Sequence, residues 1–81
     1  MNSLKNAVVV RIKQLCDERG IKPNTLANLS GVTPSTVYSL LDENRNSVQL
    51  KTVKILCDGL NITLAEFFDT KEFSELEQEI K

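Results

Sequence analysis

The feature of this sequence that most limits its fold is the spacing of its apolar residues, which recur at intervals of three and four along almost the whole chain. No stretch alternates apolar and polar residues with the period of two that a half-buried β-strand requires. The 81 residues include only three glycines and two prolines, which is few turn residues for a fold of many strands. A chain of this length is enough for one compact unit, so the sequence predicts a single all-α fold.

The spacing predicts five helices, followed by a short sixth one. The first helix is expected to end at Gly20, because glycine readily takes the left-handed conformation of a helix end. Pro23 and Pro34 suit the first turns of the second and third helices, and Thr33 is placed to cap the third. The apolar residues expected on the buried faces of the first four helices are Leu4, Val8, Ile12 and Leu15, then Leu26, Ala27 and Leu29, then Val37, Leu40 and Leu41, then Leu50, Val53, Cys57 and Leu60.

The last third of the chain predicts two further short helices. Thr63 and Glu66 have the spacing of a capping box, which opens a very short fifth helix. Asp69 is expected to open the sixth helix. The apolar side of that helix would comprise Phe73, Leu76 and Ile80. The chain is therefore expected to divide into a compact domain over residues 1–69 and an acidic amphipathic helix over residues 70–81.

The composition argues against an enzyme. The chain contains no histidine, which removes both the commonest general base and the commonest metal ligand. A Ser–His or Cys–His nucleophile is therefore impossible within it. Cys16 and Cys57 lie on or beside apolar stripes and are expected to be small buried hydrophobes; Phe67 and Phe68 are expected to belong to the core. We expect no catalytic residue, no metal and no cofactor.

The beginning of the chain favours a cytoplasmic protein without a membrane segment. Residues 1–11 hold an apolar run of only four residues, whereas a secretory signal needs about 7–15 and a transmembrane helix about 20. Two cysteines without an evident pairing suit a reducing compartment. An intermolecular disulfide is the less favoured alternative.

The net charge of −1 conceals a strong asymmetry. The first 54 residues carry eight Lys or Arg against four acids, whereas the last 27 carry two against seven. The basic part is compatible with a nucleic-acid partner. Solvated faces that keep the protein soluble would give the same split, so charge alone leaves both interpretations open.

Residues 26–40 carry the most informative pattern in the chain. Two short helices joined by about four residues that include Gly31 fit a helix-turn-helix unit, although a generic αα corner has similar spacing. The string LANLSGVTPSTVYSL resembles the signature of phage-repressor and Cro-like (XRE-type) transcriptional regulators: Leu-Ala, three residues, Gly-Val, Ser or Thr, two residues, Thr, then Ile or Val. The similarity extends over about residues 8–68. It implies a compact five-helix repressor-like DNA-binding domain.

The resemblance also implies which residues meet DNA. A recognition helix at about residues 34–41 would lie in the major groove, while the helix at about 23–29 crosses the backbone. The candidates for contact with base edges are Pro34, Ser35, Thr36, Tyr38 and Ser39. The candidates for contact with the DNA backbone are Lys22, Asn24, Asn44, Arg45, Asn46 and Lys51. The residues expected to be solvated surface charges instead are Lys5, Lys54 and Lys71.

The sequence departs from a strong reader of DNA. The expected recognition face has no Arg, Lys, Asn or Gln, the side chains that make bidentate contacts with bases. Pro23 stands where the family often has a phosphate-binding Gln, and Asp42 and Glu43 add negative charge at the end of the recognition helix. These features lower the expected affinity and leave the fold unchanged.

Two functions therefore remain open at this point. The first is sequence-specific binding of double-stranded DNA by a small regulator acting as a homodimer, since operators for this motif usually consist of two half-sites. The second is a protein-interaction module on the same fold, such as an anti-repressor or a toxin-neutralising partner, with weak or no DNA binding. The apolar edge of residues 73–80 would either pack on its own domain or meet a second copy.

Overall fold

Six helices make up most of the part of the chain that the computed structural model describes, residues 3–42, 44–45 and 47–76. They are α1 (Leu4–Arg19), α2 (Pro23–Ser30), α3 (Pro34–Leu41), α4 (Leu50–Leu60), α5 (Leu64–Phe68) and α6 (Lys71–Ser74). No strand occurs within these ranges. The all-α fold of five helices and a short sixth, predicted from apolar spacing, is confirmed.

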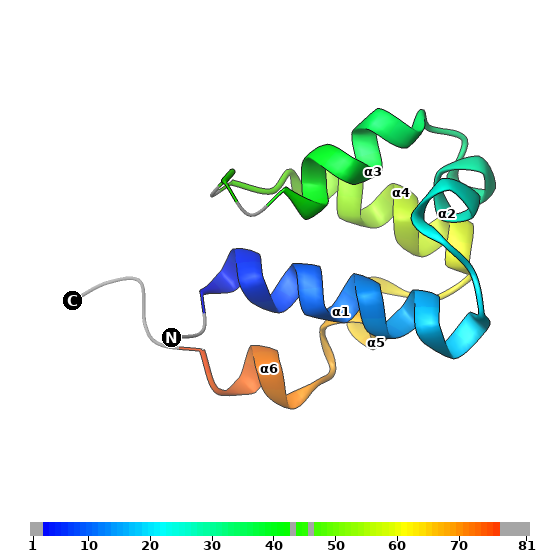
Figure 1. Ribbon diagram of the computed structural model, residues 1–81. Coiled ribbons are helices and arrows are strands. Elements are labelled where there is room, and N and C mark those ends of the chain that lie inside the picture. Colours follow the sequence, from blue (N-terminus) through cyan, green and yellow to red (C-terminus); the bar gives the residue numbers. More distant parts are fainter. Residues whose placement is uncertain (1–2, 43, 46, 77–81) are drawn as a thin grey trace.

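The long helix α1 runs through the middle of the molecule (Figure 1). On one side of it lie α3 and α4, and on the other side lies α6. The short helix α2 packs chiefly against α3 and α4, whereas α6 contacts α1. This arrangement leaves α3 at one edge of the molecule, opposite α6 (Figure 1).

Three helices end with the same backbone motif. Gly20 after α1, Gly31 after α2 and Asn61 after α4 have left-handed φ values of 62°, 72° and 59°. In each case the next residue donates its N–H to the carbonyl five residues earlier, and its apolar side chain packs against the core. These next residues are Ile21, Val32 and Ile62. The sharp turn predicted at Gly31 is confirmed, and it sets the direction in which α3 leaves α2.

The starts of the short helices follow the sequence less closely. The capping box is present, with Glu66 N–H 3.0 Å from Thr63 Oγ1 and Thr63 N–H 3.0 Å from a Glu66 carboxylate oxygen. The prediction that the Thr33 side chain caps α3 is wrong, because its hydroxyl lies 3.2 Å from the Thr36 hydroxyl and bonds no backbone N–H. The Thr36 N–H, which a Thr33 side-chain cap would accept, donates instead to the Thr33 carbonyl at 3.0 Å.

The sixth helix is shorter than predicted. Its N-cap is Thr70 and not Asp69, and the helix ends at Ser74 with Glu75 in a turn. A helix of four residues has little stability of its own, so α6 depends on the packing of Phe73. The prediction of a helix over residues 70–81 therefore fails at Glu75, and its part over residues 77–81, including Ile80, lies outside the described residues.

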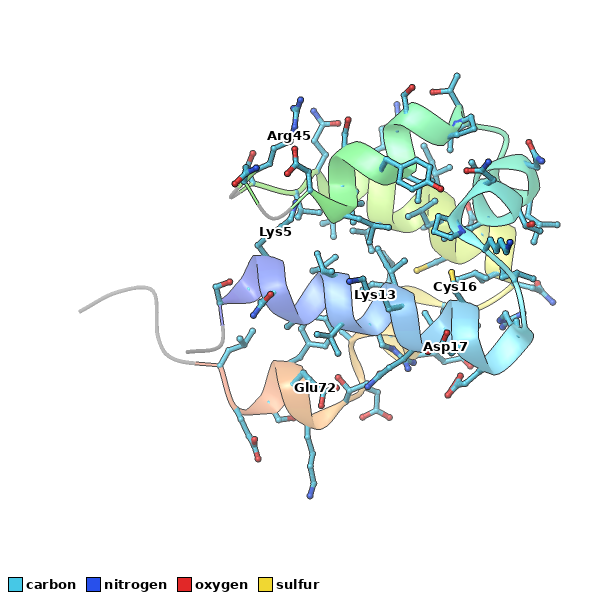
Figure 2. All side chains as sticks on the ribbon, viewed as in Figure 1. Lys5, Lys13, Cys16, Asp17, Arg45 and Glu72 are labelled. Atoms are coloured by element: carbon cyan, nitrogen blue, oxygen red, sulfur yellow. The ribbon has the colours of Figure 1, made fainter. Side chains whose placement is uncertain are left out.

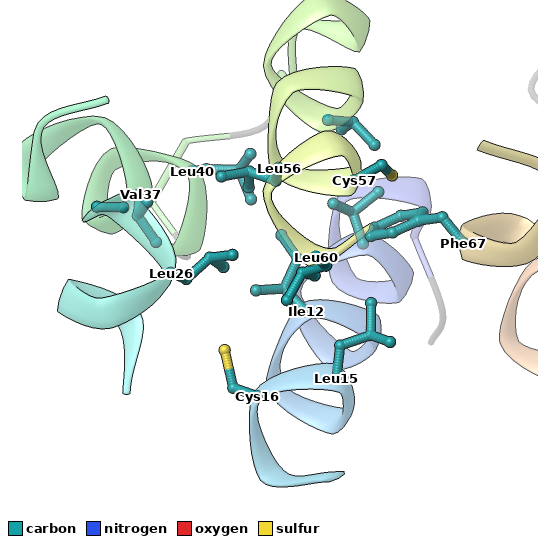
Figure 3. Packing of buried hydrophobic residues seen from close by; sticks show 13 residues of the cluster. Ile12, Leu15, Cys16, Leu26, Val37, Leu40, Leu56, Cys57, Leu60 and Phe67 are labelled. Atoms are coloured by element: carbon teal, nitrogen blue, oxygen red, sulfur yellow. The ribbon is translucent and has the colours of Figure 1, made fainter. Parts of the chain in front are cut away.

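The core lies between α1, α2, α3, α4 and α5 (Figure 3). Its largest fully buried side chains are Phe67, Ile12, Leu26, Leu56, Leu60 and Val37. Three residues predicted to be buried are exposed instead, namely Leu4 by 50%, Leu29 by 56% and Leu50 by 62%. Each stands in the first or last turn of its helix, where the spacing still matches the apolar stripe but no neighbouring helix covers the residue.

The three phenylalanines form one aromatic cluster beneath α6. The Phe67 and Phe68 rings meet edge to face at 5.0 Å, and the Phe68 and Phe73 rings at 4.8 Å. Such perpendicular pairs are a favourable geometry for aromatic rings. Phe67 is fully buried, and Phe73 packs against the core of its own chain. The apolar edge of residues 73–80 was expected either to pack on its own domain or to meet a second copy, and Phe73 packs on its own domain.

Two basic residues of α1, Arg11 and Lys5, contact the rest of the fold and are not free surface charges. Arg11 donates its Nε to the Phe67 carbonyl at 2.8 Å and a terminal nitrogen to the Glu66 carbonyl at 2.9 Å, which ties the end of α5 to α1. The prediction that Lys5 is a solvated surface charge is wrong, because only 7% of Lys5 is exposed. Its position three and seven residues before Val8 and Ile12 places it on the buried face of α1.

Candidate nucleic-acid interface

The outward face of α3 presents most of the residues predicted to contact bases. Val37 and Leu40 are buried and hold the helix against the core, as expected. The opposite side carries four exposed residues, which are Pro34, Ser35, Tyr38 and Ser39. Tyr38 is 51% exposed and is the largest of them. The helix α3 lies at the edge of the molecule (Figure 1), and the exposure of these four residues leaves this side of it open to a partner.

Thr36 differs from the other four candidates. It is half-buried, and its hydroxyl lies 3.2 Å from the Thr33 hydroxyl. Its position two residues after Pro34 turns it away from the centre of the exposed face, since successive helical residues are about 100° apart. Thr36 therefore lies at the margin of the candidate interface.

The beginning of α2 offers a second group of candidates. Lys22 is the N-cap residue and makes no side-chain cap, and Pro23 at the first position has no N–H. Lys22 and Asn24 are exposed. Free backbone N–H groups and the helix dipole favour an anion at such an end, and the Lys22 ammonium would add to that attraction.

The loop after α3 is organised by Asp42. A carboxylate oxygen of Asp42 accepts the Asn44 N–H at 3.0 Å, and its carbonyl accepts the Arg45 N–H at 3.1 Å. The other carboxylate oxygen lies 3.7 Å from Nε of Arg45, whose side chain is 65% exposed. Arg45 stands out from this loop next to the end of α3 (Figure 2). Asp42 thus shapes the loop and also holds the cation that was predicted to contact phosphate.

A hollow beside α3 brings in residues that the sequence analysis did not single out. Ser47, Gln49 and Thr52 line it together with Thr36, Ser39 and Arg45. Gln49 is the N-cap of α4 and makes no side-chain cap, so its amide group is available. The only sequence feature that could have indicated Gln49 is its position directly before the apolar stripe of α4. The residues of the hollow come from both sides of a loop without periodicity, so their spacing did not predict that they meet.

A second hollow lies between α1 and the start of α2. It is lined by Lys13, Cys16, Lys22, Pro23 and Leu41, among others. Lys13 is exposed and makes no ion pair among the residues described. Lys13 is thirteen residues before Leu26, where the predicted motif begins, so only the fold reveals that it lines the same hollow as Lys22.

The other residues predicted to contact the DNA backbone are either exposed or outside the described part of the chain. Asn44 and Lys51 are exposed, on the loop and in the first turn of α4. Asn46 and Glu43 lie outside the described residues. Lys54 and Lys71 are exposed, as expected, and Lys54 forms an ion pair with Asp58.

The two cysteines are buried and unpaired, as predicted. Burial raises the pKa of the Cys16 thiol, and the negative charge of Asp17 raises it further. Burial also raises the pKa of the Cys57 thiol, with Asp58 adding to the effect. Both thiols therefore stay protonated and are poor nucleophiles. The described residues contain no cluster of acids and cysteines suited to a metal ion, and none of their helices is long and apolar enough to cross a membrane.

Comparisons with known proteins agree with this geometry. The crystal structure of prophage Lp1 protein 11 superposes with a TM-score of 0.81, at 24% identity, covering 94% of this chain and 100% of that one; this likeness concerns the fold. A search of curated proteins finds no match. Residues 11–72 match the Cro/C1-type helix-turn-helix DNA-binding domain, a family of binding domains and not of enzymes. Because the match covers most of the chain, this protein belongs to the family of Cro/C1-type helix-turn-helix DNA-binding domains.

Proposed function

We propose that this protein is a small transcriptional regulator that binds double-stranded DNA sequence-specifically, with α3 in the major groove and α2 across the backbone. The observation that carries the proposal is the outward face of α3, which is exposed while Val37 and Leu40 anchor the helix from behind. In helix-turn-helix proteins the second helix of the motif lies in the major groove and contacts base edges. A cytoplasmic location, where such a regulator would meet DNA, remains a prediction.

The proposed contacts fall into two groups. Ser35, Tyr38 and Ser39 would meet base edges, with Pro34 beside them and Thr36 at the margin. The backbone contacts would come from Lys22, Asn24, Asn44, Arg45 and Lys51, joined by Lys13 and Gln49. Phosphate contacts fix the position of the protein, whereas base contacts carry the sequence information.

The division of roles leads to a test with single variants. Arg45→Ala should weaken binding to all duplexes alike, because it removes a phosphate contact. Ser35→Ala or Tyr38→Ala should change which sequence is preferred. Lys71→Ala is the charge-matched control for Arg45→Ala, because Lys71 is exposed on α6 at the opposite edge (Figure 1). Fluorescence anisotropy with labelled duplexes selected from a random library measures each affinity.

Salt dependence checks the same proposal independently. Binding should fall steeply as salt increases, since the lysine and arginine side chains displace counterions from DNA. Arg45→Ala should lower the slope of log K against log salt by about one. Absent or salt-insensitive binding across the library would reject the proposal, and equal changes in preference for all three variants would reject the division of roles.

We further propose that the protein binds its operator as a homodimer. Sites for this motif usually contain two half-sites about 34–36 Å apart, each read by one recognition helix. At saturating protein, analytical ultracentrifugation should find two chains on a duplex with two half-sites and one chain when a half-site is scrambled. One chain on the intact duplex would contradict the dimer.

A protein-interaction module is the second candidate, and specific observations favour it. The chain is acidic overall, with a net charge of −1, and Leu29 of α2 is 56% exposed. Pro23 and the lack of bidentate donors on α3 also weaken the case for tight DNA binding. Capture of a protein partner by a chain that has no affinity for any duplex would favour this function over the first.

A further inference from the structure

The exposed face of α3 consists of two chemically different columns. Pro34 and Tyr38 are four residues apart, as are Ser35 and Ser39, so each pair lies on adjacent turns of the helix. The first column presents a pyrrolidine ring and a phenol ring that is half exposed. The second presents two hydroxyl groups. An apolar column therefore runs directly beside a hydrogen-bonding one.

The chemistry of this face limits how it can distinguish bases. None of its four residues carries an amide, a guanidinium, an ammonium or a carboxylate group. Bidentate contacts from such groups provide roughly 5- to 150-fold discrimination each. The serine hydroxyls and the Tyr38 hydroxyl can each donate or accept, so they distinguish bases poorly. The apolar column is what remains to provide selectivity.

Thymine is the base whose major-groove edge matches both columns. It presents a C5-methyl group next to the O4 acceptor. The methyl group suits the ring of Tyr38 and the neighbouring Pro34, while O4 can accept a hydrogen bond from a serine hydroxyl. Cytosine offers an amino group in place of O4 and has no methyl group, although its 5-methylated form restores one.

We propose that this face recognises the C5-methyl group of pyrimidines in the major groove, with Tyr38 as the specificity-determining residue and Ser35 bonding the adjacent exocyclic group. The inference rests on the proposed function, because it requires α3 to lie in that groove. The ligand class is thymine, and 5-methylcytosine in a matching position. Burial of one methyl group changes affinity about fourfold, so the expected effect at each recognised base is of this size.

The test removes the methyl group alone. After selection of a preferred duplex from a random library, each thymine is replaced in turn by deoxyuridine, which differs only by the missing methyl. The affinity of the full chain, measured by anisotropy, should fall about fourfold at one or two positions. Replacing thymine at such a position by cytosine should weaken binding further, and 5-methylcytosine there should recover about fourfold relative to cytosine.

Three variants assign the effect to a residue. Tyr38→Ala should bind the thymine and deoxyuridine duplexes equally, because the ring is gone. Tyr38→Phe keeps the ring and should preserve the thymine-to-deoxyuridine ratio. Ser35→Ala should bind more weakly with that ratio unchanged. Tyr38 is exposed, so these variants should fold, and circular dichroism checks that they do.

The outcomes separate the two proposals. Selective binding with equal affinity for thymine and deoxyuridine at every position would overturn methyl recognition and leave DNA binding intact. A full methyl effect retained in Tyr38→Ala would overturn the assignment to Tyr38. Failure to bind any duplex would overturn the proposed function, and the present inference with it.

Discussion

Arg45 has two competing partners, the carboxylate of Asp42 within the chain and a phosphate of bound DNA. The Arg45 Nε lies 3.7 Å from the Asp42 oxygen, with the two side chains 65% and 42% exposed. Exposed pairs of this kind contribute at most about 1 kcal/mol. Asp42 therefore positions Arg45 beside α3 without holding it firmly.

Removing the charge of Asp42 should strengthen DNA binding. Asp42→Asn keeps an oxygen that can accept the Asn44 N–H, so the loop should be preserved, while the competitor for Arg45 is lost. From the modest strength of an exposed pair we expect a gain of up to about fivefold. Anisotropy at constant salt measures it.

Asp58→Asn is the matched control for this substitution. It removes an equal charge from the exposed Lys54–Asp58 pair, which involves no proposed DNA contact. Its affinity should change less than that of Asp42→Asn. Equal effects of the two substitutions would mean that net charge, and not release of Arg45, governs the gain.

At the scale of elements, the packing of α2 on α4 determines where the helix-turn-helix sits on the core. A Cβ at Gly59 of α4 would lie 2.2 Å from Ser30 Oγ and 2.9 Å from Ser30 Cα. Such distances require the absence of a side chain at Gly59. Here glycine is needed for close approach of two helices, whereas at Gly31 it is needed for its positive φ of 72°.

Gly59→Ala should destabilise the fold although it improves helix propensity. Alanine is favoured over glycine by about 1 kcal/mol inside a helix, but forcing α2 and α4 apart costs about 1–3 kcal/mol. We expect a net loss of up to about 2 kcal/mol in the free energy of unfolding. Urea denaturation measures the change.

Ser30→Ala separates the clash of the new methyl group with the Ser30 side chain from its clash with the backbone of α2. Ser30 Oγ has no hydrogen-bond partner among the residues described, so its removal alone should change stability little. Combined with Gly59→Ala it should recover only part of the loss, since the new methyl group would still press on the backbone of α2. A Gly59→Ala protein more stable than the parent would show that the helices separate freely.

At the scale of the whole molecule, the acidic residues are distributed so that the face of α3 proposed to bind DNA lies away from many of them. The acids of α5 and α6, such as Glu66 and Glu72, belong to the part of the molecule opposite α3 (Figures 1 and 2). Like charges placed away from the groove oppose DNA binding less, because salt screens them over about 8–10 Å. The net charge of −1 therefore does not by itself exclude DNA as this protein's partner.

Stability of the whole fold should decrease at alkaline pH. Burial raises the pKa of the Cys16 and Cys57 thiols above their ordinary value of 9.0. In the unfolded chain both thiols lose their protons as the pH rises through 9.0, while the folded state keeps them. The stabilisation is thus complete below that pH and is lost progressively above it.

Urea denaturation at about pH 8 and about pH 10 tests this dependence. A Cys16→Ala, Cys57→Ala double variant should be less stable at both values, because it leaves cavities, but its stability should decrease less between them. An equal decrease in the parent and the double variant would assign the alkaline loss to groups other than the two thiols.

The helix pattern, the turn at Gly31 and the capping box at Thr63 were predictable because each depends on residues close together in the sequence. Helix period, glycine at positive φ and a reciprocal cap are local properties of the backbone. The same local reasoning identified the outward residues of α3, since buried Val37 and Leu40 fix the phase of that helix. Family membership follows from these positions.

Predictions of burial failed where they depended on distant neighbours, whereas the cap expected from Thr33 and the helix start expected at Asp69 failed locally. Leu29 and Leu50 match apolar stripes but lie beyond the helices that would cover them, and Lys5 is covered although it is charged. Burial depends on which elements pack against a given turn, and periodicity contains no information about that packing.

The sequence by itself therefore determined the order of the helices, the ends of α1 and α2 at Gly20 and Gly31, and the face that α3 turns outward. Only the tertiary structure decided that Gln49 and Lys13 flank the candidate interface, that Lys5 is covered, and that Phe73 packs against the core of its own chain. The physical reason is that local backbone preferences act within a few residues, whereas a site is made by side chains that approach one another through space.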